Sequence, residues 1–144
     1  MTTKIIKQIL FSLFFLISIH TFAQLPEHHL LYPEGIKDNP IIHEGGEICT
    51  EVPALKGSIL KKNKEYSKTS IPSYMVFPAN KETNKGIAVV IFPGGGFTKT
   101  CFDKEGTEIA MWLADKGVNC MVVKYRVNER DEDGKFKIPW ETMQ

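Results

Sequence analysis

The sequence predicts an α/β fold, because two apolar strand patterns flank a helical pattern. Residues 86–92 (GIAVVIF) form a continuous β-branched apolar run, which is typical of a strand covered on both faces. Residues 118–125 (VNCMVVKY) predict a second strand of this kind. Between them, Ile109, Trp112 and Leu113 follow the i, i+3, i+4 spacing of one helical face. Two buried strands joined by a helix indicate a parallel sheet with a right-handed crossover.

Shorter elements are expected on both sides of this unit. Residues 73–77 (SYMVF) predict a strand closed by Pro78, and the polar residues 56–70 are expected to hold its hairpin partner. The polar residues 80–85 predict a turn, and Gly117 is a natural cap for the end of the helix.

The end of the sequence predicts a loop and the start of another helix. Residues 126–139 are polar, with Asp133-Gly134 as the expected turn. Residues 140–144 have the pattern of a first helical turn.

Composition and charge exclude several classes of protein. The chain has 144 residues, of which 42% are hydrophobic and 24% charged, so a packed domain is expected rather than disorder. The 18 Lys and Arg residues nearly balance the 17 Asp and Glu residues, which argues against a nucleic-acid partner bound through phosphate contacts.

Residues 1–23 have the three zones of a secretory signal peptide. Lys4 and Lys7 precede the apolar residues 9–19, and a small residue, Ala23, marks the expected cleavage site. The apolar run is shorter than the ~20 residues that cross a bilayer, so no stable membrane anchor is expected. We therefore predict export to the periplasm or the medium.

Residues 24–57 predict an extended leader that runs over the surface of the domain, because prolines recur and no period is sustained. His28-His29 has no second ligand cluster, and the zinc-protease pattern that begins at His43 has Glu47 where a histidine is needed. We expect loop or surface histidines and no metal site.

The three cysteines are Cys49, Cys101 and Cys120. Although an exported chain meets an oxidising compartment, we expect no disulfide. Cys120 falls within an apolar strand pattern and is expected to be a buried, inert thiol.

A run of three glycines, within residues 93–97 (PGGGF), lies between a strand and a helix and is the main candidate site. A dinucleotide-binding loop would need a glycine where Lys99 stands, and a Walker-type loop would need one in place of Thr98. Two readings remain open, a tight turn without a ligand and an oxyanion hole made of backbone N–H groups.

Three motifs resemble the N-terminal part of exported bacterial α/β-hydrolases of the esterase/lipase family, which include acetyl-xylan-esterase-like proteins. These motifs are Pro93 to Phe97, Asp103 to Gly106 (DKEG) and Lys124 to Arg126 (KYR). The leader residues 31–35 (LYPEG) also resemble the opening of that family.

The resemblance implies a role for each residue of the glycine loop. Gly95 and Gly96 would donate their N–H groups to the oxyanion, while Gly94 would shape the turn. Pro93 stands where many relatives have histidine, which matters little because only backbone donors are needed. Phe97 would line the acyl pocket, or would be a plain core aromatic residue.

Residues beyond the loop are expected to support it. Asp103 and Glu105 would hold the start of the helix, and Arg126 could pair with them or lie solvated in a loop. The resemblance implies neither a metal ion nor a cofactor.

The sequence contains no complete catalytic triad. The serines after the signal peptide all precede the glycine loop, none lies in a Gly-x-Ser-x-Gly elbow, and no histidine follows His43. Residues 58–144 are therefore expected to be the N-terminal portion of an α/β-hydrolase domain, an incomplete three-layer α/β/α fold truncated before the nucleophile elbow. In that case the strand 118–125 would be left as a sheet edge.

These observations predict the N-terminal fragment of a secreted serine esterase that deacetylates plant polysaccharide such as xylan. Its partner would be an acylated carbohydrate or another ester, and activity is expected only of a full-length parent. The alternative is a non-catalytic exported α/β module that binds a carbohydrate or protein. The sequence leaves the oligomeric state open.

Overall fold

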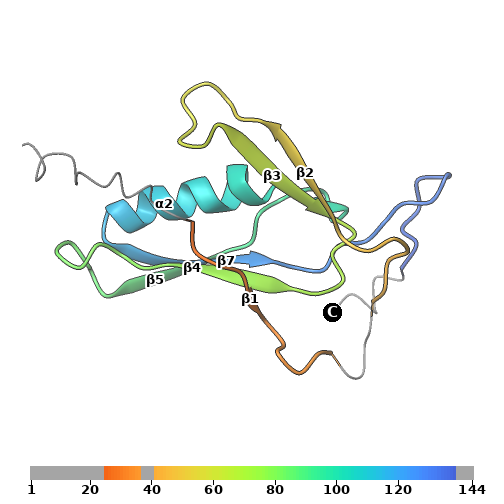
Figure 1. Ribbon diagram of the computed structural model, residues 1–144, viewed down its shortest axis with the longest axis horizontal. Helices are drawn as coiled ribbons and strands as arrows, with labels where there is room; N and C mark the ends of the chain where they lie inside the picture. The colour runs from red at the N-terminus through yellow and green to blue at the C-terminus, as the bar shows by residue number, and fades with distance from the viewer. Residues whose placement is uncertain (1–24, 37–40, 139–144) are drawn as a thin grey trace, which may run out of the picture.

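The computed structural model describes residues 25–36 and 41–138, which form two sheets and one helical segment (Figure 1). The larger sheet has the strand order β1–β4–β7–β5, with β1 His29–Leu30, β4 Ser73–Phe77, β5 Ile87–Ile91 and β7 Val118–Lys124. The smaller sheet has the order β2–β3–β6, with β2 Ile48–Pro53, β3 Lys62–Ser67 and β6 Lys99–Thr100. The predictions for residues 1–23 and for a helix over 140–144 lie outside the described residues.

The mixed α/β class predicted from the sequence is confirmed. β5 and β7 run parallel, and the segment between them contains a π-helical turn, η1 Asp103–Thr107, which continues into α2 Glu108–Asp115. β4 is antiparallel to β7, with all five residues of β4 in register. The carboxyl ends of β5 and β7 therefore meet at one edge of the sheet.

The described residues do not form three α/β/α layers. In Figure 1, α2 and the β2–β3 hairpin lie on the same side of the larger sheet. Val76 and Val90, which point to the other side, are exposed, and no described helix covers them. The expected hairpin partner of β4 is also wrong, because β3 pairs with β2 along its whole length.

The prediction for the buried face of the helix is wrong in part. Ile109 and Trp112 are 44% and 58% exposed, whereas Ala110 is fully buried and Leu113 is partly buried against the core. Small residues allow the helix axis to approach β7 and β4 closely, and the bulky side chains then point outward.

The sequence predicts that β5 is covered on both faces and that β7 is left as a sheet edge, and the structure shows the opposite arrangement. β7 lies between β4 and β5, and its central residues Cys120 and Val122 are buried. β5 is an edge strand whose residues 87–90 are all exposed. An apolar run therefore indicates a strand here, but it does not show which strand the sheet covers.

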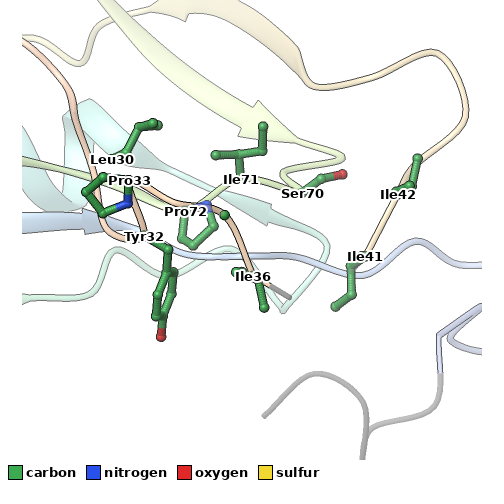
Figure 2. Close-up of a pocket in the computed structure, with 10 residues that line it drawn as sticks. Leu30, Tyr32, Pro33, Ile36, Ile41, Ile42, Ser70, Ile71 and Pro72 are labelled. Atoms are coloured by element: carbon green, nitrogen blue, oxygen red, sulfur yellow. The ribbon is translucent and has the colours of Figure 1, made fainter. Parts of the chain in front are cut away.

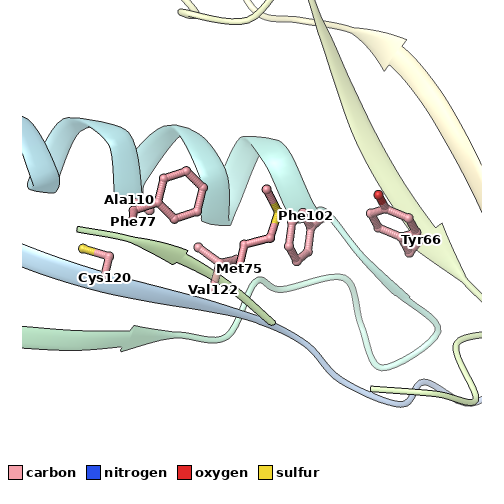
Figure 3. Close-up of a cluster of buried hydrophobic side chains, with 7 residues drawn as sticks. All are labelled: Tyr66, Met75, Phe77, Phe102, Ala110, Cys120 and Val122. Carbon is pink, nitrogen blue, oxygen red and sulfur yellow. The ribbon is translucent and has the colours of Figure 1, made fainter. Parts of the chain in front are cut away.

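The core lies between the helix and the larger sheet and extends to β3 (Figure 3). Its buried members are Tyr66, Met75, Phe77, Phe102, Ala110, Cys120 and Val122. The predicted burial of Cys120 is confirmed, with 2% of its surface exposed. Burial of several such side chains is the main driving force for a domain of this size.

Two turns predicted from the sequence are present in the structure. Gly117 follows the helix with φ +87° and donates its amide to the carbonyl of Ala114 at 3.0 Å. Asp131 and Lys135 close the turn predicted at Asp133-Gly134, with 2.8 Å between the Asp131 nitrogen and the Lys135 oxygen. Among the helices described, none is long and apolar enough to cross a membrane.

Candidate functional site

The glycine loop at the carboxyl end of β5 is fastened to the residues that follow β7. The hydroxyl of Tyr125 donates to the carbonyl oxygen of Pro93 at 2.6 Å. The backbone amide of Asn128 donates to the carbonyl oxygen of Phe97 at 2.7 Å. The two parallel strands thus bring their carboxyl-terminal loops together, which is where open α/β sheets bind ligands.

Residues that follow the loop donate hydrogen bonds to two more of its carbonyl oxygens. The amide of Cys101 donates to the carbonyl oxygen of Gly94 at 2.8 Å, and the amide of Lys99 donates to that of Gly95 at 3.3 Å. These bonds direct loop carbonyls into the protein, so acceptor groups of the loop are already used.

Glu105 fixes the first amide of the loop. Its Oε2 accepts a hydrogen bond from the amide of Gly94 at 3.0 Å, across 11 residues of sequence. Glu105 lies in η1, so this bond joins the loop to the start of the helix. A carboxylate that accepts from a backbone amide makes a charge-assisted bond, which is stronger than a neutral one.

The next two amides, those of Gly95 and Gly96, donate no hydrogen bond to any described residue. Gly95 has φ +151° and Gly96 has φ +64°, conformations that favour glycine, and Phe97 is also left-handed at φ +62°. Successive amides in turn conformations can form a concave site for an anion. The loop therefore offers two donors, while the carbonyls of Pro93, Gly94, Gly95 and Phe97 already accept hydrogen bonds.

An aromatic side chain and an ion pair border these amides. Phe97 is 52% exposed, so the reading of Phe97 as a core aromatic is wrong. The Lys99 ammonium lies 2.6 Å from a carboxylate oxygen of Glu65, next to the loop. The exposed ring leaves an apolar surface beside the donors, while the lysine charge is paired.

Two titratable side chains beside the loop, those of Tyr125 and Cys101, have raised pKa values. Burial, together with the charges of Cys101 and Glu105, raises the pKa of Tyr125, so its phenol stays a donor to Pro93. Burial and the nearby Glu65 carboxylate raise the pKa of the Cys101 thiol. Because the thiolate is the nucleophilic form, Cys101 is poorly suited to attack a carbonyl.

Replacing Tyr125 by phenylalanine is expected to lower the free energy of unfolding by about 1 kcal/mol, because the inward-facing Pro93 carbonyl loses its donor. Urea denaturation measures this difference. Tyr74→Phe in β4 is the control, since the Tyr74 hydroxyl has no hydrogen bond to any described residue. Equal stability of the wild type and Tyr125→Phe would contradict the proposed role of the phenol.

Asp103 and Arg126, the other predicted supporting residues, flank the same region. The carboxylate of Asp103 is buried and accepts the amide of Lys64 at 2.7 Å, which joins the helix to β3. Arg126 lies two residues after the end of β7 and is half-buried. An ion pair of Arg126 with Asp103 or Glu105 stays a prediction.

His43 lies in a loop, as expected, but it is buried rather than on the surface. Its Nδ1 lies 2.6 Å from Oε1 of Glu129, and its Nε2 donates to the carbonyl of Val127 at 2.8 Å. Both ring nitrogens are engaged, so His43 cannot act as a base for a substrate here. The partners are 86 residues apart, and no local pattern could have predicted the contact.

Ser73 and His28 form a hydrogen bond that the sequence does not predict. The Ser73 hydroxyl lies 3.1 Å from Nδ1 of His28, at the start of β4. Burial and the charge of Lys124 lower the pKa of His28. Among the described residues no carboxylate is hydrogen-bonded to the His28 ring, so the pair does not make a triad. Because the two residues are 45 positions apart, no local sequence pattern predicts their contact.

The described residues contain no group of three or more His, Cys, Asp or Glu that could hold a metal ion. Cys49, Cys101 and Cys120 are all free thiols. The arrangement therefore offers neutral backbone donors rather than a charged ligand cluster.

A pocket of about 410 Å³ lies between the leader and the residues before β4 (Figure 2). Most of its lining is apolar. The lining residues are Leu30, Tyr32, Pro33, Gly35, Ile36, Ile41, Ile42, Ser70, Ile71 and Pro72. No local sequence pattern predicts this pocket, because its two walls are far apart in the chain.

No family model, curated protein or solved structure matches the chain. The function of the loop is therefore inferred from its geometry and chemistry.

Proposed function

We propose that residues 93–97 are the oxyanion-binding loop of an exported serine hydrolase that cleaves carboxylic esters. Attack on an ester carbonyl develops negative charge on its oxygen, and preorganised N–H groups stabilise that charge. The observation that carries the proposal is that the amides of Gly95 and Gly96 have no acceptor among the described residues, while neighbouring carbonyls do have donors.

The position of the loop favours an oxyanion over a phosphate. Phosphate loops place their glycines directly at the N-terminus of a helix. Here β6 separates the glycines from η1, so the helix dipole is not directed at the loop amides. In α/β-hydrolases, an N–H of the oxyanion hole comes from the loop after the third strand of the sheet.

We propose further that residues 58–144 are the N-terminal portion of an α/β-hydrolase domain. The parallel pair β5 and β7, with the glycine loop at its carboxyl edge, supports this proposal. The nucleophile and the base would be residues outside this sequence. By the resemblance of the motifs, the substrate would be an acetyl or acyl ester on plant polysaccharide such as xylan, reached after export.

Expression of the chain alone and of the reading frame continued beyond residue 144 tests the proposal. The chain alone is expected to release no p-nitrophenol from p-nitrophenyl acetate and to resist a fluorophosphonate probe. The extended product is expected to turn over the ester and to be labelled at a serine within a Gly-x-Ser-x-Gly sequence. A continuation without that sequence and a later histidine would refute the proposal.

Ser73 provides an internal check on this experiment. Its hydroxyl is hydrogen-bonded to the imidazole ring of His28, and contact between a serine hydroxyl and a histidine ring is the first requirement of a nucleophilic centre. Fluorophosphonate labelling that disappears in Ser73→Ala would move the reaction centre away from the glycine loop.

A second candidate function, a non-catalytic binding module, is favoured by the apolar pocket of Figure 2. Apolar pockets with few polar groups are typical ligand sites. Ile71 is a highly exposed lining residue, so Ile71→Asp should remove binding without disturbing the core. Saturable binding of an acetylated xylo-oligosaccharide that is lost in this variant, without turnover, would favour the module.

A further inference from the structure

The first described residues of the leader, 25–31, form a strap over the core. In Figure 1 the strap, in orange, comes to β1 from the side of the larger sheet on which α2 lies. Leu25 packs against the core cluster, and β1 pairs only two residues with β4. The amide of Leu31 adds a hydrogen bond to the carbonyl oxygen of Pro72 at 3.1 Å. A segment attached by so short a strand can open locally while the rest of the domain stays folded.

A pocket of about 310 Å³ lies between the strap and the elements beneath it. Leu25 and His28 line the pocket on the side of the strap, and Tyr66, Phe102 and Asp103 line it on the side of the domain. Protein interiors are normally filled to the density of organic crystals. The strap therefore packs loosely on the domain, and His28 is one of its main points of contact.

The ring of His28 lies against two aromatic rings and a hydroxyl group. Its centroid is 5.1 Å from that of Phe102 and 5.9 Å from that of Tyr66. Its Nδ1 is 3.1 Å from the hydroxyl of Ser73. These contacts remove water from part of the imidazole, which disfavours a positive charge on the ring.

A lysine already occupies the same surroundings. The ammonium of Lys124 lies 4.7 Å from the centroid of the Tyr66 ring, the ring that His28 also contacts. Lys124 stands directly opposite Ser73 in the pairing of β7 with β4, and its side chain is only 10% exposed. A protonated His28 would therefore place a second positive charge beside one that is largely buried.

Charges on three other elements also act on His28. Glu47, before β2, and Asp103, in η1, favour its protonation, while Lys64 in β3 opposes it. Glu47 already pairs with Lys124, with 2.6 Å between its Oε1 and the ammonium. Burial and the charge of Lys124 outweigh the two carboxylates, so the pKa of His28 falls below its ordinary value of 6.5.

Two further titratable side chains share the pockets of His28. Burial raises the pKa of Tyr66, so this phenol stays neutral. His43 lines a second pocket together with His28, and its ring is held by Glu129 and by the carbonyl of Val127. A test of His28 must therefore separate its effect from that of His43.

We propose that His28 makes the attachment of the strap depend on pH, so that the strap stays on the domain while the imidazole is neutral and comes off when it is protonated. Release would uncover the rings of Tyr66 and Phe102 beneath the strap. This inference goes beyond the proposed function and does not rest on it. It uses only contacts between described residues, so it applies whether or not the chain continues past residue 144.

The sign of the effect follows from the two states of the ring. In the released strap His28 has its ordinary pKa of 6.5, whereas in the attached strap the pKa is lower. Attachment is therefore strongest above pH 6.5 and weakens as the pH falls below 6.5 toward the pKa of the attached state. Glu129 acts in a lower range, since its pKa lies below 4.5.

Amide hydrogen exchange of the full chain, followed by mass spectrometry, measures release of the strap. Wild type and His28→Asn are compared at the same pH, from about pH 5 to about pH 8, which cancels the effect of pH on the exchange chemistry. Protection of residues 25–31 is expected to fall several-fold in the wild type as the pH drops and to stay nearly constant in His28→Asn. Peptides of β7 should keep their protection in both proteins.

His29→Asn is the matched control. His29 is the next residue in the strap, but its ring lies against Tyr74, with 5.5 Å between the centroids. This variant is expected to keep the pH dependence of the wild type. Lys124→Met removes the neighbouring ammonium and is expected to move the titration midpoint of the His28 ring upward, as measured by NMR.

Two results would overturn the proposal. The first is strap protection that does not change with pH in the wild type, or changes equally in His28→Asn. The second is a titration midpoint of the His28 ring at or above 6.5 in the folded protein. If Lys124→Met fails to fold, the two histidine variants decide. If the chain alone does not fold, the same comparison in the product extended beyond residue 144 decides. The measurement needs no ester, so its outcome is independent of esterase activity.

Discussion

Gly95→Ala is expected to lower the free energy of unfolding by about 3 kcal/mol or more, or to prevent folding of the loop. A methyl group at Gly95 would collide with the carbonyl oxygen of Lys99, which is backbone and cannot move aside as a side chain can. The residue also has φ +151°, where L-residues are strained. Urea denaturation measures the loss.

Gly96→Ala is the matched control for that variant. Gly96 also has a positive φ, +64°, but a methyl group there would have no described atom within 4 Å. The expected loss is therefore only the backbone term of about 1 kcal/mol. Equal losses at Gly95 and Gly96 would show that close packing against Lys99 does not hold the loop.

The second large effect is expected at Glu129, the partner of the buried His43. Glu129→Gln keeps the shape of the side chain but removes its charge, and should lower the free energy of unfolding by about 2 kcal/mol at neutral pH. The contact joins the leader to the loop after β7, and Asn128 of that loop holds the glycine loop. Exposed Glu132→Gln, in the same loop, is the control and should change stability little.

The pH dependence of this effect has a definite sign. Burial alone would raise the pKa of Glu129, but hydrogen bonds from His43 and Lys137 and the charges of Lys137 and Lys68 outweigh it, so the pKa falls below its ordinary value of 4.5. A carboxyl group with a lowered pKa stabilises the fold above its unfolded pKa, and that stability is lost as the pH falls through the folded pKa.

The difference between the wild type and Glu129→Gln should therefore be largest at neutral pH and shrink below about pH 4.5. Thermal denaturation across pH 3 to 7 measures it. A difference that stays constant down to pH 3 would show that the carboxylate charge is not the stabilising factor.

Local patterns predicted the elements of this fold well. β4 begins and ends where the sequence indicates, and β5 and β7 fall within their predicted apolar runs. Gly117 ends the helix at the expected position, because a single residue with positive φ suffices to stop it. The sequence also predicts the position of the glycine loop, because three consecutive glycines between a strand and a helix indicate a loop from nearby residues alone.

The pairing of the elements was harder to predict. The sequence predicts that the polar residues 56–70 hold the hairpin partner of β4. In the structure β3, which lies in this stretch, pairs with β2, because packing in three dimensions decides which strands pair. Ala110, rather than Ile109 or Trp112, faces the sheet, because the helix lies close to the sheet and only a small side chain fits between them. Hydrophobic periodicity does not specify which face a neighbour will cover.

The sequence by itself determined the strands, the helix, the turns and the position of the glycine loop, because these depend on residues close in the chain. Only the tertiary structure decided which loop amides keep their N–H groups unpaired. The donors to Pro93 and Phe97 come from Tyr125 and Asn128, about 30 residues away. The same is true of the place of β5 at the edge of the described sheet, since burial depends on which strands come to lie beside it.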